Sequence, residues 1–190
     1  MIPPLDATRL HRQSPSLRWL LFACLLALSA CATAPPGNVT VVTPFDAARF
    51  TGKWYEIARL DHGFERGLSD VSARYRLQDD GSLEVINRGY DAKREAWREA
   101  AGRAVFTGDA NRGSLKVSFF GPFYGGYHVI ALDPQYRWAM VIGPDPGYLW
   151  ILARDRQLPA DVFDRLVGEA RALGVDTGQL IRVGQSRDDG

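Results

Sequence analysis

Side chains that could act as nucleophiles or metal ligands are few and widely spaced in this 190-residue chain. There are two cysteines, Cys24 and Cys31, and three histidines, His11, His62 and His128. A zinc site needs three or four such ligands close together, and neither histidine beyond residue 31 has a cysteine near it. No Gly-x-Ser-x-Gly elbow is present, although a Ser–His–Asp arrangement of distant residues stays open. We therefore expect a binding protein rather than an enzyme, with no metal and no cofactor.

The first thirty residues have the pattern of a signal peptide. Arg9, Arg12 and Arg18 lead into the apolar run 19–28, which is too short to span a bilayer as a mature helix. The run ends in Leu28-Ser29-Ala30-Cys31, which resembles the bacterial lipobox, in which the cysteine is acylated and becomes the new N-terminus. The alternative is an ordinary secretory signal cleaved after Ala30, which leaves a free thiol on Cys31.

Acylation of Cys31 predicts a protein that is anchored to a membrane, because several acyl chains on one residue give stable attachment. Ala32 follows the cysteine, and by resemblance to bacterial lipoproteins this favours the outer membrane, with the folded part in the periplasm. The expected segments are a signal peptide at 1–30, a lipidated tether at 31–44, one domain at 45–185 and a disordered tail at 186–190.

The charge balance gives no case for a nucleic-acid partner. The formal net charge is +1, and it becomes about −1 without the first thirty residues, which contain Arg9, Arg12, Arg18 and Asp6. Nineteen glycines and eleven prolines favour turn-rich β structure over a helical bundle.

Alternation of apolar and polar residues, bounded by turn residues, recurs along the chain and predicts β-strands. Asp46 suits the N-cap of a short helical turn just before the first strand, and Gly52 ends that turn. The predicted strands span residues 54–59, 71–78, 83–90, 102–108, 114–120, 127–132, 138–142 and 148–154. A polar turn region is expected at 91–98 and an aromatic loop at 121–126. The period then changes, predicting an amphipathic helix at 159–174 and a short strand at 180–183.

Three local motifs carry a resemblance to the lipocalin family. Gly52-Lys53-Trp54-Tyr55 matches the Gly-x-Trp signature, and Leu149 to Arg154 matches the final strand with its arginine. Asp133-Pro134-Gln135-Tyr136 stands in place of the family's Thr-Asp-Tyr turn and keeps only the Asp and a displaced Tyr. The span 39–185 resembles the bacterial lipoprotein lipocalins, which are related to apolipoprotein D. The resemblance implies an all-β fold: an eight-stranded antiparallel up-and-down barrel, a C-terminal helix packed outside, and a short final strand.

The resemblance also implies roles for individual residues. Arg154 is expected to pack across the indole of Trp54, next to Gly52, and to close one end of the barrel. An eight-stranded barrel has room for one small ligand in its calyx. Strand parity, counted from Trp54 and Arg154, also turns Ala58, Met140 and Tyr148 inward. The expected calyx residues are Glu56, Tyr75, Asn87, Phe106, Phe119, Tyr127, Trp138 and Trp150, of which Phe106, Phe119, Tyr127 and Trp138 depend on strand registers that a bulge would reverse.

Such a lining suits a ligand with a long apolar body and a polar end, a fatty acid or a lysophospholipid, carried or stored at the cell envelope. Glu56 is expected either to stay protonated or to pair with a nearby base. One alternative is an envelope interaction lipoprotein whose barrel is filled by side chains, and another is a lipid-acting hydrolase or isomerase. The aromatic loop at 121–127 is either a local cluster or the contact of a homodimer. Phe64 and Leu68 are candidates for contact with a membrane surface.

Overall fold

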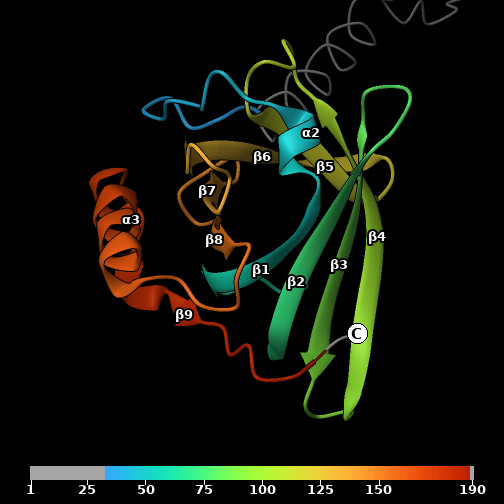
Figure 1. The fold of residues 1–190 in the computed structure, drawn as a ribbon, viewed down its shortest axis with the longest axis vertical. Coiled ribbons are helices and arrows are strands. Elements are labelled where there is room, and N and C mark those ends of the chain that lie inside the picture. Colours follow the sequence, from blue (N-terminus) through green and yellow to red (C-terminus); the bar gives the residue numbers. More distant parts are fainter. Residues whose placement is uncertain (1–32, 189–190) are drawn as a thin grey trace, which may run out of the picture. The chain divides into compact units, whose positions relative to one another are not determined.

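The computed structural model describes residues 33–188, and these form one antiparallel barrel with a helix outside it (Figure 1). From β1 to β8 each strand pairs with the next in sequence, and β1 closes the ring by pairing with both β2 and β8. The short strand β9 adds to the outside of β1. The strands are β1 (Gly52–Arg59), β2 (Leu68–Leu77), β3 (Leu83–Asp91), β4 (Ala96–Phe106), β5 (Ser114–Phe120), β6 (Phe123–Leu132), β7 (Trp138–Ile142), β8 (Leu149–Ala153) and β9 (Ile181–Arg182).

The helices are α2 (Ala47–Phe50), α3 (Ala160–Ala172) and the 3-10 turn η1 (Thr177–Gln179). As predicted, the Asp46 side chain caps α2, since its carboxylate accepts from the backbone N–H groups of Ala48 and Arg49. Gly52 follows with φ +91, a conformation that favours glycine, and a Cβ there would lie 3.2 Å from Nη1 of Arg154. The glycine therefore lets the chain enter β1 close against the arginine. No helix within 33–188 is long and apolar enough to cross a bilayer.

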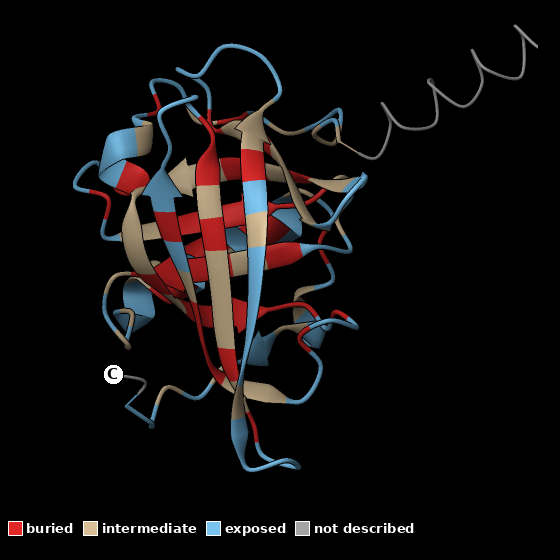
Figure 2. Cartoon of the chain, turned by 90° about the vertical axis from the view of Figure 1, so that its right-hand side faces the viewer, coloured by how far each residue is buried: buried red, intermediate tan, exposed pale blue. Residues whose placement is uncertain are grey.

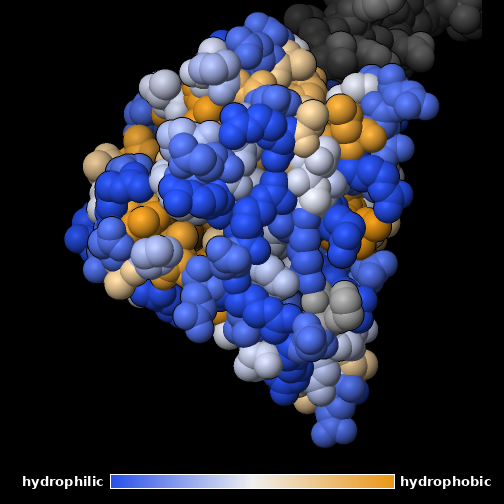
Figure 3. Space-filling model, viewed as in Figure 1, coloured by the Kyte–Doolittle hydropathy of each residue, from blue (hydrophilic) through white to orange (hydrophobic). Residues whose placement is uncertain are grey.

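The up-and-down order places the connections alternately at the two ends of the barrel. The β1–β2, β3–β4, β5–β6 and β7–β8 connections share one end, which we call the open end. The β2–β3, β4–β5 and β6–β7 connections share the other, the closed end, which α2 and the residues before it cover. The side seen in Figure 3 is mostly hydrophilic over β2 to β4, so the apolar faces of these strands point into the barrel.

Two apolar clusters hold the fold together. One fills the barrel interior, and the other lies between the barrel wall and α3. On β8 the alternation is regular, because Trp150 and Leu152 point inward while Leu149, Ile151 and Ala153 belong to the outer cluster. Figure 2 shows the resulting bands of buried and less buried residues along the strands.

Three inward assignments made from strand parity are wrong. A bulge after Glu56 shifts the β1–β8 register, so Ala58 joins the outer cluster and Arg59 turns inward. Trp138 and Met140 also belong to the outer cluster, because β7 pairs Trp138 with Ala153 and so shares its outward face. The guanidinium of Arg165 on α3 lies 4.8 Å from the Trp138 ring centroid. Trp138 is therefore no part of the calyx.

Several element boundaries also differ from the sequence prediction. β4 begins at Ala96 rather than residue 102, so most of the expected polar region 91–98 is a β-hairpin. β6 begins at Phe123, inside the expected aromatic loop, and pairs with Phe120 across a two-residue turn. The strands predicted at 114–120 and 138–142 and the helix within 159–174 are confirmed.

Candidate ligand-binding site

An inner cavity of about 80 Å³ lies inside the barrel. Its walls come from strands all round the ring, and it is mainly apolar, with polar groups toward the open end. Of the residues predicted for the calyx, those that line it are Glu56, Tyr75, Asn87, Phe119, Tyr127 and Trp150. Apolar side chains that complete the lining include Val71, Leu83, Val85, Leu115, Val117 and Leu152.

A second, wider cavity of about 440 Å³ lies at the open end. We call it the mouth cavity. It shares Glu65, Asn87 and Phe119 with the inner cavity, so the two spaces adjoin each other. Its outer rim includes Phe64, Leu68, Arg98, Phe120 and Phe123. An elongated ligand that entered the barrel interior from the rim would pass these shared side chains.

The expected contact between Trp54 and Arg154 is present, and it lies below the inner cavity, whose lining includes Phe50 but neither of these two residues. The guanidinium carbon lies 3.9 Å from the indole centroid, a favourable cation–π geometry. Arg154 also donates to the backbone carbonyls of Arg49 and Lys53, at 2.8 and 2.9 Å. The Trp54 indole N–H donates to the Phe50 carbonyl at 2.8 Å. These contacts join the end of β8 to the start of β1 and to α2.

Phe106 points into the barrel, as predicted, but it packs below the cavity. Its ring centroid lies 6.2 Å from that of Phe45 in an edge-on arrangement at the closed end. It lines neither the inner nor the mouth cavity. The structure therefore places Phe106 in the packing of the closed end rather than beside a ligand.

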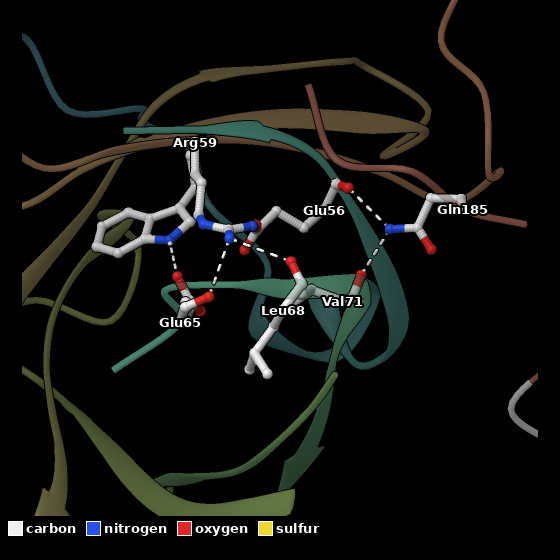
Figure 4. Close-up of polar contacts among 7 residues, drawn as sticks. Glu56, Arg59, Glu65, Leu68, Val71 and Gln185 are labelled. Atoms are coloured by element: carbon white, nitrogen blue, oxygen red, sulfur yellow. Dashed lines mark hydrogen bonds and ion pairs between the residues drawn. The ribbon is translucent and has the colours of Figure 1, made fainter. Parts of the chain in front are cut away.

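A buried polar cluster stands where the two cavities meet (Figure 4). Arg59 Nη1 donates to Glu56 Oε1 at 2.6 Å, and Nη2 donates to the carbonyls of Glu65 and Leu68 at 2.9 and 3.2 Å. The Trp150 indole N–H donates to Glu65 Oε2 at 3.1 Å. Arg59 thus ties β1 to the β1–β2 connection, and it leaves the Glu65 carboxyl facing the cavities.

Burial disfavours the charged forms of both carboxyls. Burial, and then the charge of Glu65, raise the pKa of Glu56 from 4.5 to about 8, against the opposing effect of Arg59. Burial also raises the pKa of Glu65. With one guanidinium between two carboxyls, the cluster is neutral only when one carboxyl holds a proton. Glu56 is expected from the sequence either to stay protonated or to pair with a base. The structure combines the two, because Glu56 pairs with Arg59 and has a strongly raised pKa.

His62 lies in the β1–β2 connection and stacks on aromatic rings. Its ring centroid is 4.8 Å from Tyr148, 5.6 Å from Phe64 and 4.7 Å from Trp150. Burial, together with the charge of Arg59, lowers its pKa to about 4, so the imidazole is neutral near pH 7. The ring therefore acts as an apolar part of the open-end wall.

Two further polar contacts orient the interior. The hydroxyls of Tyr75 and Tyr127 lie 2.8 Å apart, which satisfies both groups inside the barrel, and burial raises the pKa of each. The side-chain oxygen of Asn87 is buried and has no hydrogen-bond partner within residues 33–188. Because Asn87 lines both cavities, this oxygen offers an acceptor to a ligand at their junction.

Sequence reasoning missed Arg59 and Glu65. Strand parity placed Arg59 on the outer face, and Glu65 lies in a connection without periodicity. The available signal was a carboxyl three residues before an arginine in an otherwise apolar strand, which suits a local ion pair. Cys31, the expected lipidation site, lies outside the described residues. Within residues 33–188, no three His, Cys, Asp or Glu side chains are grouped so as to hold a metal ion.

Comparison with known proteins decides the family. Residues 45–185 match the model of the lipocalin-like domain. The chain is a lipocalin. It is 52% identical over 163 residues to "Outer membrane lipoprotein Blc" of Citrobacter freundii, covering 86% of this chain and 92% of that protein. The protein of the same name from Vibrio cholerae is 45% identical, covering 87% of this chain and 96% of that one.

Solved structures agree with this lipocalin fold. Insecticyanin from the tobacco hornworm Manduca sexta superposes with a TM-score of 0.64 at 23% identity, covering 82% of this chain and 88% of that one. Lipocalins bind small hydrophobic ligands, and the Blc relatives are binding or transport proteins rather than known enzymes. A mainly apolar cavity inside the barrel, with a wider cavity beside it at the open end, fits that class of activity.

Proposed function

We propose that this lipocalin binds a lipid with one long apolar chain, a fatty acid or a lysophospholipid, and carries or stores it at the cell envelope. The observation that carries the proposal is the pair of adjoining cavities, the mouth cavity and the apolar cavity inside the barrel, with polar groups where they meet. The apolar tail would enter toward Tyr75 and Leu115, and the polar end would stay near Asn87, Glu65 and the rim.

The energetics suit such a ligand. Burial of one methylene contributes about 0.8 kcal/mol, so about ten buried methylenes contribute roughly 8 kcal/mol, which corresponds to micromolar affinity. The inner cavity of about 80 Å³ is smaller than the cavity of about 150 Å³ that accepts benzene in an engineered protein. A long tail therefore needs side chains such as Phe119 to move, while the mouth cavity holds the rest of the ligand.

We also propose that Cys31 is acylated and anchors the protein to the outer membrane, with the barrel in the periplasm. The printed name of the Blc relatives, outer membrane lipoprotein, supports this location. The proposed division is a signal peptide at 1–30, a tether at 31–44, a lipocalin domain at 45–185 and a tail at 186–190. Part of the tether lies against the barrel, since Val41 is buried. The start of the tail does too, since the Ser186 and Arg187 N–H groups donate to Asp70.

The small inner cavity favours a second candidate function. If the interior does not open, the barrel is in effect filled by side chains, and the protein serves as an envelope interaction lipoprotein, as a monomer or a homodimer. The two functions differ in one measurable respect, which is saturable binding of a single-chain lipid.

Tryptophan fluorescence separates these candidates. We would titrate the delipidated mature protein with palmitic acid and, separately, with palmitoyl lysophosphatidylethanolamine. Trp150 lines the inner cavity and Trp138 packs against α3, so Trp150→Phe should abolish the fluorescence change and Trp138→Phe should preserve it. A saturable fluorescence change in the wild type that is lost in Trp150→Phe and kept in Trp138→Phe supports the carrier function. If one of the two lipids gives no change, that class of lipid is excluded as the ligand. No change with either lipid would leave the filled-barrel function. Analysis of the same mixtures for hydrolysed or isomerised lipid tests the lipid-acting enzyme, because a carrier leaves its lipid unchanged.

A further inference from the structure

Three phenylalanines at the open end are left exposed to solvent. Phe64 is 53% exposed, Phe120 is 77% exposed and Phe123 is 79% exposed. All three line the mouth cavity, so they form one apolar rim, which we call the phenylalanine rim. Exposed apolar groups that cluster in this way usually mark an interaction surface.

The β5–β6 hairpin presents two of these side chains at its tip. Phe120 pairs with Phe123 across the turn made by Gly121 and Pro122. Packing within the barrel does not account for these rings, because each keeps more than three quarters of its surface in water. Their apolar surface is therefore available to a partner beyond the open end.

The chain that leads to the proposed anchor approaches the barrel near the same end. Val42 is held against the wall, since its N–H donates to Val129 and its carbonyl accepts from Gly113. From there toward the N-terminus the chain turns outward to the end of α3, where the Asn38 side chain donates to the Leu173 carbonyl at 3.3 Å, and it returns to β6 at Thr33. The Thr33 carbonyl oxygen lies 3.4 Å from the position that a Cβ on Gly126 would take.

Gly126 pairs with Lys116 in the first half of β5, and it lies beside one of the open-end connections. It lies three residues from Phe123 on β6, and the backbone nitrogen of Pro144, in the β7–β8 connection of the open end, is also 3.4 Å from its Cβ position. Cys31 is two residues before Thr33, and two residues span at most about 7 Å. Because so little chain separates it from Thr33, an acylated Cys31 would hold the membrane near this part of the wall, beside the β7–β8 connection.

We propose that the open end docks on the phospholipid membrane that holds the anchor, with the phenylalanine rim in the interfacial region. This rests on the proposed acylation of Cys31 but not on the identity of the ligand. Basic side chains around the rim lie close to carboxylates, with Arg66 at 2.7 Å from Asp61, and Arg94 and Arg98 at 2.6 and 3.9 Å from Asp91. Charge therefore contributes little, and aromatic insertion supplies the attachment.

In this orientation the mouth cavity faces the lipid bilayer. A lipid tail can then enter the barrel from the bilayer, and return to it, without crossing water. The orientation also leaves the closed end, with α2 and the β4–β5 connection, pointing away from the membrane.

Two matched labels test the orientation. Gly121 lies in the β5–β6 turn and Gly108 in the β4–β5 connection, and at both positions an added side chain meets open space. We would make Gly121→Cys and Gly108→Cys separately in the acylated mature lipoprotein, in which Cys31 is blocked and the new thiol is the one to react. Each labelled protein is reconstituted in vesicles of phosphatidylethanolamine and phosphatidylglycerol that contain a spin-labelled lipid. We expect strong quenching of the label at 121 and none at 108.

A second pair of variants tests the aromatic contact. Phe120→Ser with Phe123→Ser should remove the quenching at 121 and weaken vesicle binding of the unacylated protein about tenfold or more. Leu77→Ser, which changes an exposed apolar residue at the closed end, should do neither. Quenching at 108 instead of 121, or at neither, would overturn the proposal.

Crosslinking between two labels at position 121 without lipid quenching would also overturn it and assign the rim to a second copy of the chain. The lipid titration described above, run on the same labelled proteins, reports the carrier function separately. If that titration fails while the label at 121 is quenched, the orientation stands and the carrier function does not.

Discussion

The protein should lose about 2 kcal/mol of folding free energy between pH 6.5 and pH 8 because Glu56 is buried. The pKa of Glu56 is 4.5 in an exposed state and about 8 in the folded protein, so between these values the folded state holds a proton that the unfolded state has lost. Its stabilising contribution is fully present below pH 4.5 and is lost as the pH rises through 8.

His62 has the opposite sign over a lower range. Its pKa falls from 6.5 to about 4 on folding, so its contribution is present above pH 6.5 and is lost as the pH falls through 4. Between pH 4.5 and 6.5 the two effects oppose each other, and the free energy of unfolding should change little. From pH 6.5 to 8 Glu56 acts without His62, and one pKa unit corresponds to about 1.36 kcal/mol, which gives the decrease of about 2 kcal/mol. Glu65, whose pKa is also raised, adds in the same direction.

Urea unfolding of the lipid-free protein, followed by tryptophan fluorescence at several pH values, measures this profile. Glu56→Gln keeps an acceptor for Arg59 but cannot ionise. The decrease in the free energy of unfolding above pH 6.5 should therefore shrink to the part that Glu65 contributes. The same variant should reveal the His62 effect as a rise in stability between pH 4.5 and 6.5. Glu84→Gln removes a carboxyl from the outer face of β3, where it pairs with Arg76 at 3.0 Å, and serves as the matched control for the loss of a carboxyl. If Glu56→Gln kept the whole decrease above pH 6.5, the argument from burial would be refuted.

Three further substitutions distinguish packing from ligand binding. Arg59→Met removes the buried partner of Glu56 and the hydrogen bonds to two backbone carbonyls, so it should lower the free energy of unfolding in urea by about 3–5 kcal/mol. Adding Glu56→Gln should recover part of this loss. Equal losses in the single and double variants would contradict the buried pair. Trp54→Ala should cost about 3–5 kcal/mol of stability with the lipid affinity of the folded fraction retained, whereas an unchanged melting temperature with lost binding would place Trp54 in the ligand site. Tyr75→Ala should mainly weaken lipid binding in the fluorescence titration, and the reverse pattern, full binding with a large loss of stability, would place Tyr75 in the core alone.

Much of the barrel was predictable because its central strands each have one buried face. On β2 and β3, inward Tyr75 and Val85 alternate with outward polar residues, so parity assigned Tyr75 and Asn87 correctly. The helix α3 was equally clear, because Phe163, Leu166 and Ala170 recur at helical spacing and bury one side.

The wrong predictions concern strands that lack this contrast between a buried and an exposed face. β7 is covered by the barrel interior on one face and by α3 on the other, so both faces are apolar and nothing in the sequence marks Trp138 as outward. The first half of β4 is mostly exposed, so it lacks the alternation that identifies a strand. In β1 a single extra residue after Glu56 reverses parity, and it is the pairing with β8, distant in sequence, that reveals it.

The narrow inner cavity has a consequence for the rate of lipid exchange. If the tail enters only when the interior widens, the apparent affinity falls in proportion to the fraction of molecules that are open, and uptake is no faster than opening. A substitution that enlarges the interior, such as Leu115→Ala, would remove about 2–5 kcal/mol of stability and at the same time speed both uptake and release. Tight packing of this barrel and rapid turnover of its cargo are therefore opposed, and the residence time of a bound lipid depends on how closely the empty protein fills its own interior.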